Sequence, residues 1–174
     1  MMNPSSTGLW LGRVVSRLSS AGAVLSSAAF VLMVGLIVLE VILRSFFGKS
    51  TLIASEYSGY LLAAMIYLGL GFSFREGAHI RITFLQNRLS SLAYHWIEIF
   101  CHLAAGIICI LSTKFLFHTV LTSYERGMQA YTVAETPLYI PQAIVLLGLF
   151  LFTLQVLARL IQLLLDFPRK QPAD

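Results

Sequence analysis

Charged residues are scarce in this chain. Only 11% of its 174 residues are Asp, Glu, Lys or Arg, whereas a typical soluble domain carries about 25%. Hydrophobic residues make up 57% of the chain, and the mean hydropathy is +0.81. This composition argues against an ordinary soluble domain and predicts an integral membrane protein.

Cysteine and aspartate are also rare, and common catalytic motifs are missing. Cys101 and Cys109 are the only cysteines, and one predicted helix would hold them about 12 Å apart along its axis. That distance is too long for a disulfide, so we expect both to pack as small apolar residues. The sequence has no G-x-S-x-G, H-E-x-x-H or C-x-x-C motif, and its two aspartates, Asp166 and Asp174, lie in the C-terminal segment. We therefore predict no enzymatic activity.

What the chain does have is four long apolar runs. Each reaches or exceeds the ~20 residues that cross ~30 Å of hydrocarbon at ~1.5 Å per residue. The predicted spans are residues 22–45, 53–74, 92–119 and 137–165. With short connections they use nearly the whole chain, so we predict a single all-α membrane domain over residues 1–174.

Two other segments have the pattern of short interfacial amphipathic helices. Residues 9–20 place Arg13 and Arg17 on one face and apolar residues on another, which suits the membrane surface. A signal peptide is the competing interpretation, but the apolar run that follows far exceeds the ~7–15 residues of such a signal, so we expect a retained first span. The central loop, residues 75–91, repeats Leu or Ile at helical spacing, and an ordinary turn is the alternative there.

Lys and Arg are distributed unevenly between the two sides of the predicted bundle. Eight of the twelve lie in the N-terminal segment, the central loop and the region from Arg159 onward. The other four, assigned to the opposite side, are Arg44, Lys49, Lys114 and Arg126. Because short basic loops stay in the cytoplasm, we predict cytoplasmic N and C termini, with the tail at residues 166–174. Residues 120–135 would face the periplasm. The net charge of +4 is then a signal of topology and of contact with membrane lipid, and we expect no nucleic-acid partner.

His95, Glu98 and His102 share one face of the third predicted helix, at a spacing that could hold a metal ion. No other span offers His, Asp or Cys at matching depth, so we expect a polar stripe facing the bundle or a partner, and no metal. Haem needs axial ligands from two sides, whereas His95, His102 and His118 are all predicted on one helix. We predict no cofactor. An anchor subunit of a redox complex remains an alternative, which a haem absorption band would reveal.

The middles of the four spans offer a solute nothing to bind. A transporter's own substrate path usually shows intramembrane charges or broken helices, whereas Glu40, Glu56 and Glu98 all lie near span ends. The mid-span residues are Met33, Met65, Gly106 and Gly148. We therefore expect that this chain does not move a solute alone, which argues against a stand-alone channel.

Local spacing predicts several contacts near the ends of the spans. Glu40 and Arg44, at i and i+4, should form an ion pair, and Glu56 should lie at the outer interface with Arg44 or Lys49 as partner. Thr136 should cap the fourth helix, with Pro137 at its first position. A small-residue pattern predicts close approach of a neighbouring helix to the second span; its members are Ser55, Gly59 and Ala63.

Five short segments together resemble the small membrane subunit of tripartite ATP-independent periplasmic (TRAP) transporters. They are residues 41–44, 55–57, 69–71, 75–82 and 136–141. The Arg-x-Gly-x-His-Ile sequence at residues 75–80 is the most specific of them, and the resemblance runs from about residue 20 to 165.

The resemblance implies an accessory role in the bacterial inner membrane. In that family the small subunit packs beside a large multi-helix subunit, which carries the substrate and sodium sites. A soluble periplasmic substrate-binding protein delivers the substrate, typically a carboxylate-bearing organic acid, and the sodium gradient drives its import. This chain would brace the large subunit and add to the docking surface for the binding protein.

The resemblance also suggests roles for individual residues. Gly77 would permit a turn with φ > 0. His79 would cap the second helix or bond to the partner subunit, or merely stabilise its own turn. Arg44 would contact the binding protein, or only reach lipid headgroups. The candidate residues for a partner interface or a structural motif are Arg44, Glu56, Arg75, Gly77, His79, Arg81, Pro137 and Pro141.

Overall fold

The computed structural model describes residues 4–76 and 91–165, and in these ranges the chain is helical apart from its connections. The helices are α1 (Pro4–Phe47), α2 (Ala54–Arg75), α4 (Ser91–Glu125) and α5 (Tyr139–Leu165). All four are long and apolar enough to cross a membrane. The predicted all-α chain with four spans is confirmed.

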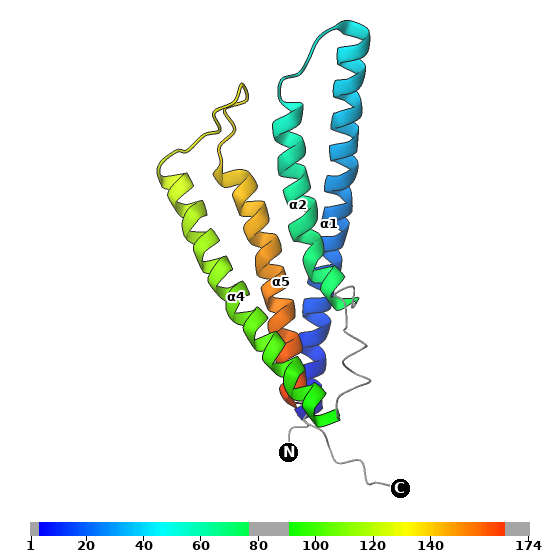
Figure 1. Ribbon diagram of the computed structural model, residues 1–174, viewed down its shortest axis with the longest axis vertical. Helices are drawn as coiled ribbons and strands as arrows, with labels where there is room; N and C mark the ends of the chain where they lie inside the picture. The colour runs from blue at the N-terminus through cyan, green and yellow to red at the C-terminus, as the bar shows by residue number, and fades with distance from the viewer. Residues whose placement is uncertain (1–3, 77–90, 166–174) are drawn as a thin grey trace.

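The helices run alternately up and down, so each end of the bundle collects particular connections (Figure 1). The start of α1, the end of α2, the start of α4 and the end of α5 share one end, which we call the Arg75 end. The α1–α2 connection lies at the opposite end, which we call the Glu40 end. α1 packs along α2, α2 along α5, and α5 along α4. In the view of Figure 1 the helices converge toward the Arg75 end and splay toward the Glu40 end.

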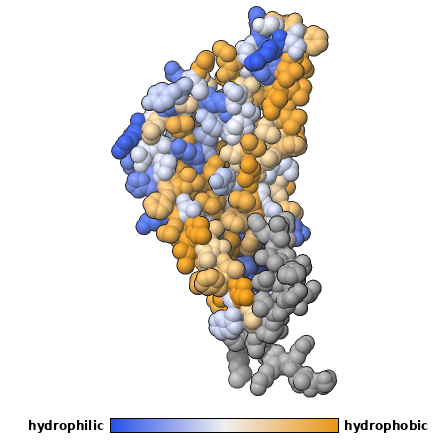
Figure 2. Space-filling view, in the orientation of Figure 1, coloured by the Kyte–Doolittle hydropathy of each residue, from blue (hydrophilic) through white to orange (hydrophobic). Residues whose placement is uncertain are grey.

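Much of the outer surface is apolar, as Figure 2 shows for one face. Large side chains such as Val31 of α1 and Ile108 of α4 remain exposed along the helices. Exposed apolar side chains along whole helices are expected where lipid or another membrane helix, and not water, is the neighbour.

α1 is one continuous helix of 44 residues, so residues 9–20 form its early turns and are not a separate helix. At ~1.5 Å per residue α1 measures about 66 Å, roughly twice the hydrocarbon thickness. Part of it must therefore lie outside the hydrocarbon, and its placement on the membrane surface stays a prediction. The predicted interfacial helix of the central loop, with Gly77, His79 and Arg81, lies outside the described residues.

The predicted start of the last helix was wrong by two residues. The Gln142 N–H donates to the Leu138 carbonyl at 3.3 Å, so Leu138 occupies the capping position and α5 begins at Tyr139. Pro137 instead forms a β-bridge with Gln129, which closes residues 126–138 into a hairpin. Pro141 does lie in the first turn of α5, where a missing backbone N–H removes no helical hydrogen bond.

The closest helix contacts are made at glycines that the sequence did not single out for packing. A Cβ added to Gly148 of α5 would lie 2.5 Å from the carbonyl carbon of Tyr67 in α2. One added to Gly22 of α1 would lie 2.7 Å from the carbonyl oxygen of Leu68. In contrast, a Cβ at Gly59 would meet nothing within 4 Å. Within this chain the close approach to α2 therefore occurs at Gly22 and Gly148 and not at Gly59.

The two cysteines are both free, and they differ in environment. Cys109 is buried, as expected of a packing residue, whereas Cys101 is exposed on α4. The packing role is thus confirmed for Cys109 alone.

Candidate functional site

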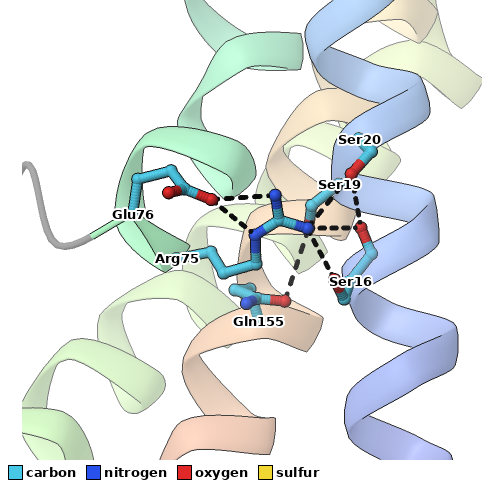
Figure 3. Close-up of polar contacts among 6 residues, drawn as sticks. All are labelled: Ser16, Ser19, Ser20, Arg75, Glu76 and Gln155. Carbon is cyan, nitrogen blue, oxygen red and sulfur yellow. Dashed lines mark hydrogen bonds and ion pairs between the residues drawn. The ribbon is translucent and has the colours of Figure 1, made fainter.

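Polar side chains gather at the two ends of the bundle. At the Arg75 end they form a group that we call the Arg75 cluster, drawn in Figure 3. Its members come from α1, from α2 and the residue that follows it, and from α5. They are Ser16, Ser19, Ser20, Arg75, Glu76 and Gln155.

The Arg75 guanidinium joins the end of α2 to the early turns of α1. Its Nη1 donates to the carbonyl oxygen of Ser16 at 3.0 Å, to Ser16 Oγ at 2.5 Å and to Ser20 Oγ at 3.0 Å. Its Nε and Nη2 donate to Glu76 Oε1 at 3.1 and 2.9 Å. Arg75 is thus engaged on both sides by groups of this chain, which suits a clamp between helices better than a site for a free anion.

Ser19 brings α5 into the Arg75 cluster. Its hydroxyl donates to Gln155 Oε1 at 3.3 Å, and the residue is buried. A Cβ on Gly71 of α2 would lie 3.2 Å from Ser19 Oγ, so α2 also approaches α1 closely at this point. Short polar side chains let α1, α2 and α5 converge here while their hydroxyl groups stay satisfied.

The predicted polar stripe of α4 is used inside the bundle. Arg159 Nη2 of α5 lies 3.0 Å from Glu98 Oε1, and His102 Nδ1 lies 2.8 Å from the Glu98 carbonyl oxygen. Because a carbonyl can only accept, His102 carries a proton on Nδ1. The His102 ring also meets Phe74 of α2 edge-on at 5.8 Å.

Within the described part of the chain, this arrangement brings together no set of metal ligands. Among residues 4–76 and 91–165 no group of three or more His, Cys, Asp or Glu could hold a metal ion. His95, His102 and His118 all lie on α4, so they cannot face one another across a haem. His79 lies outside the described residues.

At the Glu40 end one carboxylate fixes the α1–α2 connection. Glu40 Oε1 accepts from Arg44 Nη2 at 3.0 Å and from Ser50 Oγ at 2.5 Å. Glu40 Oε2 accepts from the Thr51 N–H at 3.0 Å and from Thr51 Oγ1 at 2.6 Å. The predicted Glu40–Arg44 pair is confirmed. The Arg44 side chain remains 70% exposed, so its guanidinium is still accessible to a partner.

A second carboxylate fixes the hairpin at residues 126–138. Glu56 of α2 accepts from Tyr60 Oη at 2.9 Å and from the Thr132 hydroxyl, while Thr136 Oγ1 donates to Tyr57 Oη at 3.3 Å. The proposed pairing of Glu56 with Arg44 or Lys49 was therefore wrong. α2 directs Glu56 toward the hairpin, and Arg44 bonds to Glu40 on its own helix.

Exposed apolar side chains accompany these fixed connections. They are Phe46, Phe47 and Leu52 at the α1–α2 connection, and Tyr131 and Val133 on the hairpin. Arg44 and Glu56 were predicted as interface candidates in this region, whereas these five residues were not. The available signal was large apolar side chains in polar, turn-rich segments, which are unusual unless they meet another surface. The Glu40 end thus presents two anchored connections with exposed apolar side chains.

Comparison with known proteins gives two findings. The sequence model of a family described as "Tripartite ATP-independent periplasmic transporters, DctQ component" matches residues 33–166. The chain is also similar to the "Ectoine TRAP transporter small permease protein TeaB" of Halomonas elongata. That similarity is 25% identity over 147 residues, which cover 84% of this chain and 76% of TeaB.

Proposed function

The chain belongs to the DctQ component family of tripartite ATP-independent periplasmic transporters, and we propose that this small permease subunit braces the large subunit of a sodium-coupled importer of organic acids. We also propose that its Glu40 end contributes to the docking surface for the periplasmic substrate-binding protein. The family resemblance implies the sodium coupling, the substrate class and the inner-membrane location. The name ectoine belongs to the relative, and we assign no individual substrate to this chain.

The bracing role is supported by the position of the polar contacts, most of which lie at the two ends of the bundle. The Arg75 cluster and the Glu98–Arg159 pair join helices near one end of the bundle, and Glu40 and Glu56 fix connections at the other. Near the middle, close contact is made by Gly148 with the α2 backbone, by the apolar cluster of Ala29, Ala64 and Leu68, and by isolated polar contacts such as that between the Thr113 and Thr153 hydroxyl groups. The described helices therefore hold no continuous polar path for a solute, which supports placing transport in the partner subunit.

A reconstitution experiment tests this function. The small subunit should co-purify with a much larger membrane protein, and sodium-driven uptake into vesicles should require both subunits and the binding protein. The small subunit alone should transport nothing. Sodium-coupled uptake by this chain alone, or uptake that is equally fast without it, would contradict the proposal.

Reversing the charge of Arg44 tests the docking surface. We expect Arg44→Glu to raise the concentration of binding protein needed for half-maximal uptake by roughly tenfold, because charges at the rim of an interface chiefly govern association. Uptake should recover when the binding protein is in excess. Uptake should be measured across a series of binding-protein concentrations.

Glu40→Gln is the matched control for Arg44→Glu. It weakens the same ion pair and the same connection but keeps the arginine, so it should change the half-maximal concentration much less. Unchanged uptake with Arg44→Glu at every concentration would remove Arg44 from the docking surface.

A further inference from the structure

A groove of about 700 Å³ runs between α4 and α5, a volume in the range of ligand-binding clefts. Its walls are almost entirely apolar, and Lys114, the one charged residue that lines it, contributes chiefly its alkyl stem. The residues that line it include Lys114, Phe117, Ala143, Leu147, Phe150 and Thr153. Nothing in the described chain fills this groove.

The packing of α4 against α5 places Lys114 beside an uncharged stretch of α5 that is long enough to cross a bilayer. The hydroxyl oxygens of Thr113 and Thr153 are 3.1 Å apart, so Lys114 lies at about the level of residues 150–153 of α5. That helix carries no Asp, Glu, Lys or Arg from Tyr139 until Arg159, a length of about 30 Å. Lys114 is therefore roughly 10 Å or more from either end of an apolar stretch that matches one bilayer. The predicted span 92–119 already includes Lys114, although the charge count groups it with the side opposite the termini.

Lys114 finds no counter-charge in the part of the chain that the structure describes. Four of the acidic side chains are committed elsewhere: Glu40 to Arg44, Glu76 to Arg75, Glu98 to Arg159, and Glu56 to Tyr60 and Thr132.

The remaining carboxylates are remote along the sequence. Glu125 ends α4 eleven residues beyond Lys114, about 16 Å away along the helix, and Glu135 belongs to the hairpin. Asp166 and Asp174 follow the end of α5. A lysine inside a membrane costs free energy and is usually paired with an opposite charge. The counter-charge for Lys114 is therefore expected on another molecule.

We propose that the groove between α4 and α5 receives an apolar transmembrane helix of the large subunit, and that a carboxylate on that helix pairs with Lys114. This inference rests on the proposed function, which supplies a membrane partner. A lipid phosphate lies at the interface, away from the level of Lys114. A dissolved anion would need a polar path, and the groove walls are apolar. A helix from the partner suits both the apolar groove and the unpaired Lys114. Its apolar side chains can fill the groove, its backbone is hydrogen-bonded internally, and one carboxylate on it can pair with the lysine.

Charge-removing and charge-keeping variants of Lys114 test the pairing. With a tagged small subunit and the co-expressed large subunit, we expect Lys114→Met to reduce recovery of the large subunit at least tenfold. Lys114→Arg should retain most of it. The thermal midpoint of the isolated small subunit should not fall with Lys114→Met, because in the isolated chain the charge has no partner to lose. Lys49→Met, in the exposed α1–α2 connection, is the matched control and should leave recovery unchanged.

A photo-crosslinking residue at Leu147 tests the occupant of the groove. It should crosslink to the large subunit, and Ala143→Trp, which narrows the groove, should reduce both crosslinking and recovery.

The possible outcomes separate this inference from the proposed function. Normal recovery with both Lys114→Met and Ala143→Trp would overturn the inference alone, as would crosslinking only to lipid. A lower midpoint of isolated Lys114→Met would also overturn it, because the lysine would then be serving its own chain. Failure of the unaltered small subunit to recover any large subunit would refute the proposed function itself.

Discussion

Among the glycines whose surroundings the structure describes, Gly148 should be the one whose replacement by alanine destabilises the protein most. The new Cβ would lie 2.5 and 2.6 Å from the carbonyl carbon and oxygen of Tyr67, and 2.8 Å from the backbone nitrogen of Leu68. Backbone atoms cannot rotate away as a flexible side chain can, so α5 and α2 must separate. Overpacking costs ~1–3 kcal/mol and occasionally more. A loss of about 3 kcal/mol would lower the thermal midpoint by roughly 6–12 °C in a chain of this size.

Alanine at two other helical glycines separates this clash from a general effect of substitution. A Cβ at Gly59 would meet nothing within 4 Å, and one at Gly106 would lie 3.5 Å from Leu157 Cδ2, an ordinary contact. Alanine is also the better helix former by ~1 kcal/mol. Gly59→Ala and Gly106→Ala should therefore leave the midpoint unchanged or raise it slightly. A Gly148→Ala protein as stable as these two would mean that α2 and α5 do not approach as closely as described.

The Gly148 contact matters because the helices diverge on one side of it. Toward the Glu40 end α2 and α5 separate (Figure 1), and the link across that space comes from side chains. Glu56 and Tyr57 of α2 bond to Thr132 and Thr136 of the hairpin. A bundle that is close-packed near Gly148 and tied through its connections at the Glu40 end can hold those connections in fixed positions. The proposed bracing and docking roles require this.

Contacts that are local in sequence were predictable, since their geometry depends on a single helix. The length of each apolar run gave the four spans because bilayer thickness sets the length of a crossing helix. The spacing of Glu40 and Arg44 gave their ion pair because residues at i and i+4 are neighbours on any helix. The adjacent Ser50 and Thr51, which complete the contacts of Glu40, were not predicted.

Contacts between helices could not be predicted, because they depend on how one helix lies along another. Glu56 was assigned a charged partner nearby in sequence, whereas its partner Thr132 is 76 residues away. Gly59 and Gly148 are both glycines in apolar helices, and only the packing shows that Gly148 is the one against a backbone. The depth of Lys114 likewise follows from the level at which Thr113 meets Thr153.

Arg75→Gln should release the early turns of α1 from the end of α2. The substitution removes the ion pair with Glu76 and the three hydrogen bonds to Ser16 and Ser20. Hydrogen bonds to a charged group contribute ~1.5–3 kcal/mol each, and fewer donors would then serve the serine oxygens. Because these bonds share one guanidinium, their effects are not additive, and we expect a total loss of about 2–4 kcal/mol. Backbone amides of residues 16–22 should exchange faster with deuterated solvent, while amides of α4 stay protected.

Two further variants show whether the shape of the guanidinium or only its charge holds α1. Arg75→Lys keeps the charge but replaces a planar fork of five donors with a single ammonium group, so it should recover only part of the protection. Arg126→Gln removes an exposed arginine at the other end of the bundle and should change nothing in residues 16–22. If Arg75→Gln left exchange in residues 16–22 unaltered, the other contacts of α1, such as those of Ser19 and Gly22, would be sufficient to hold it. Arg75 would then be free to serve a partner or a lipid headgroup.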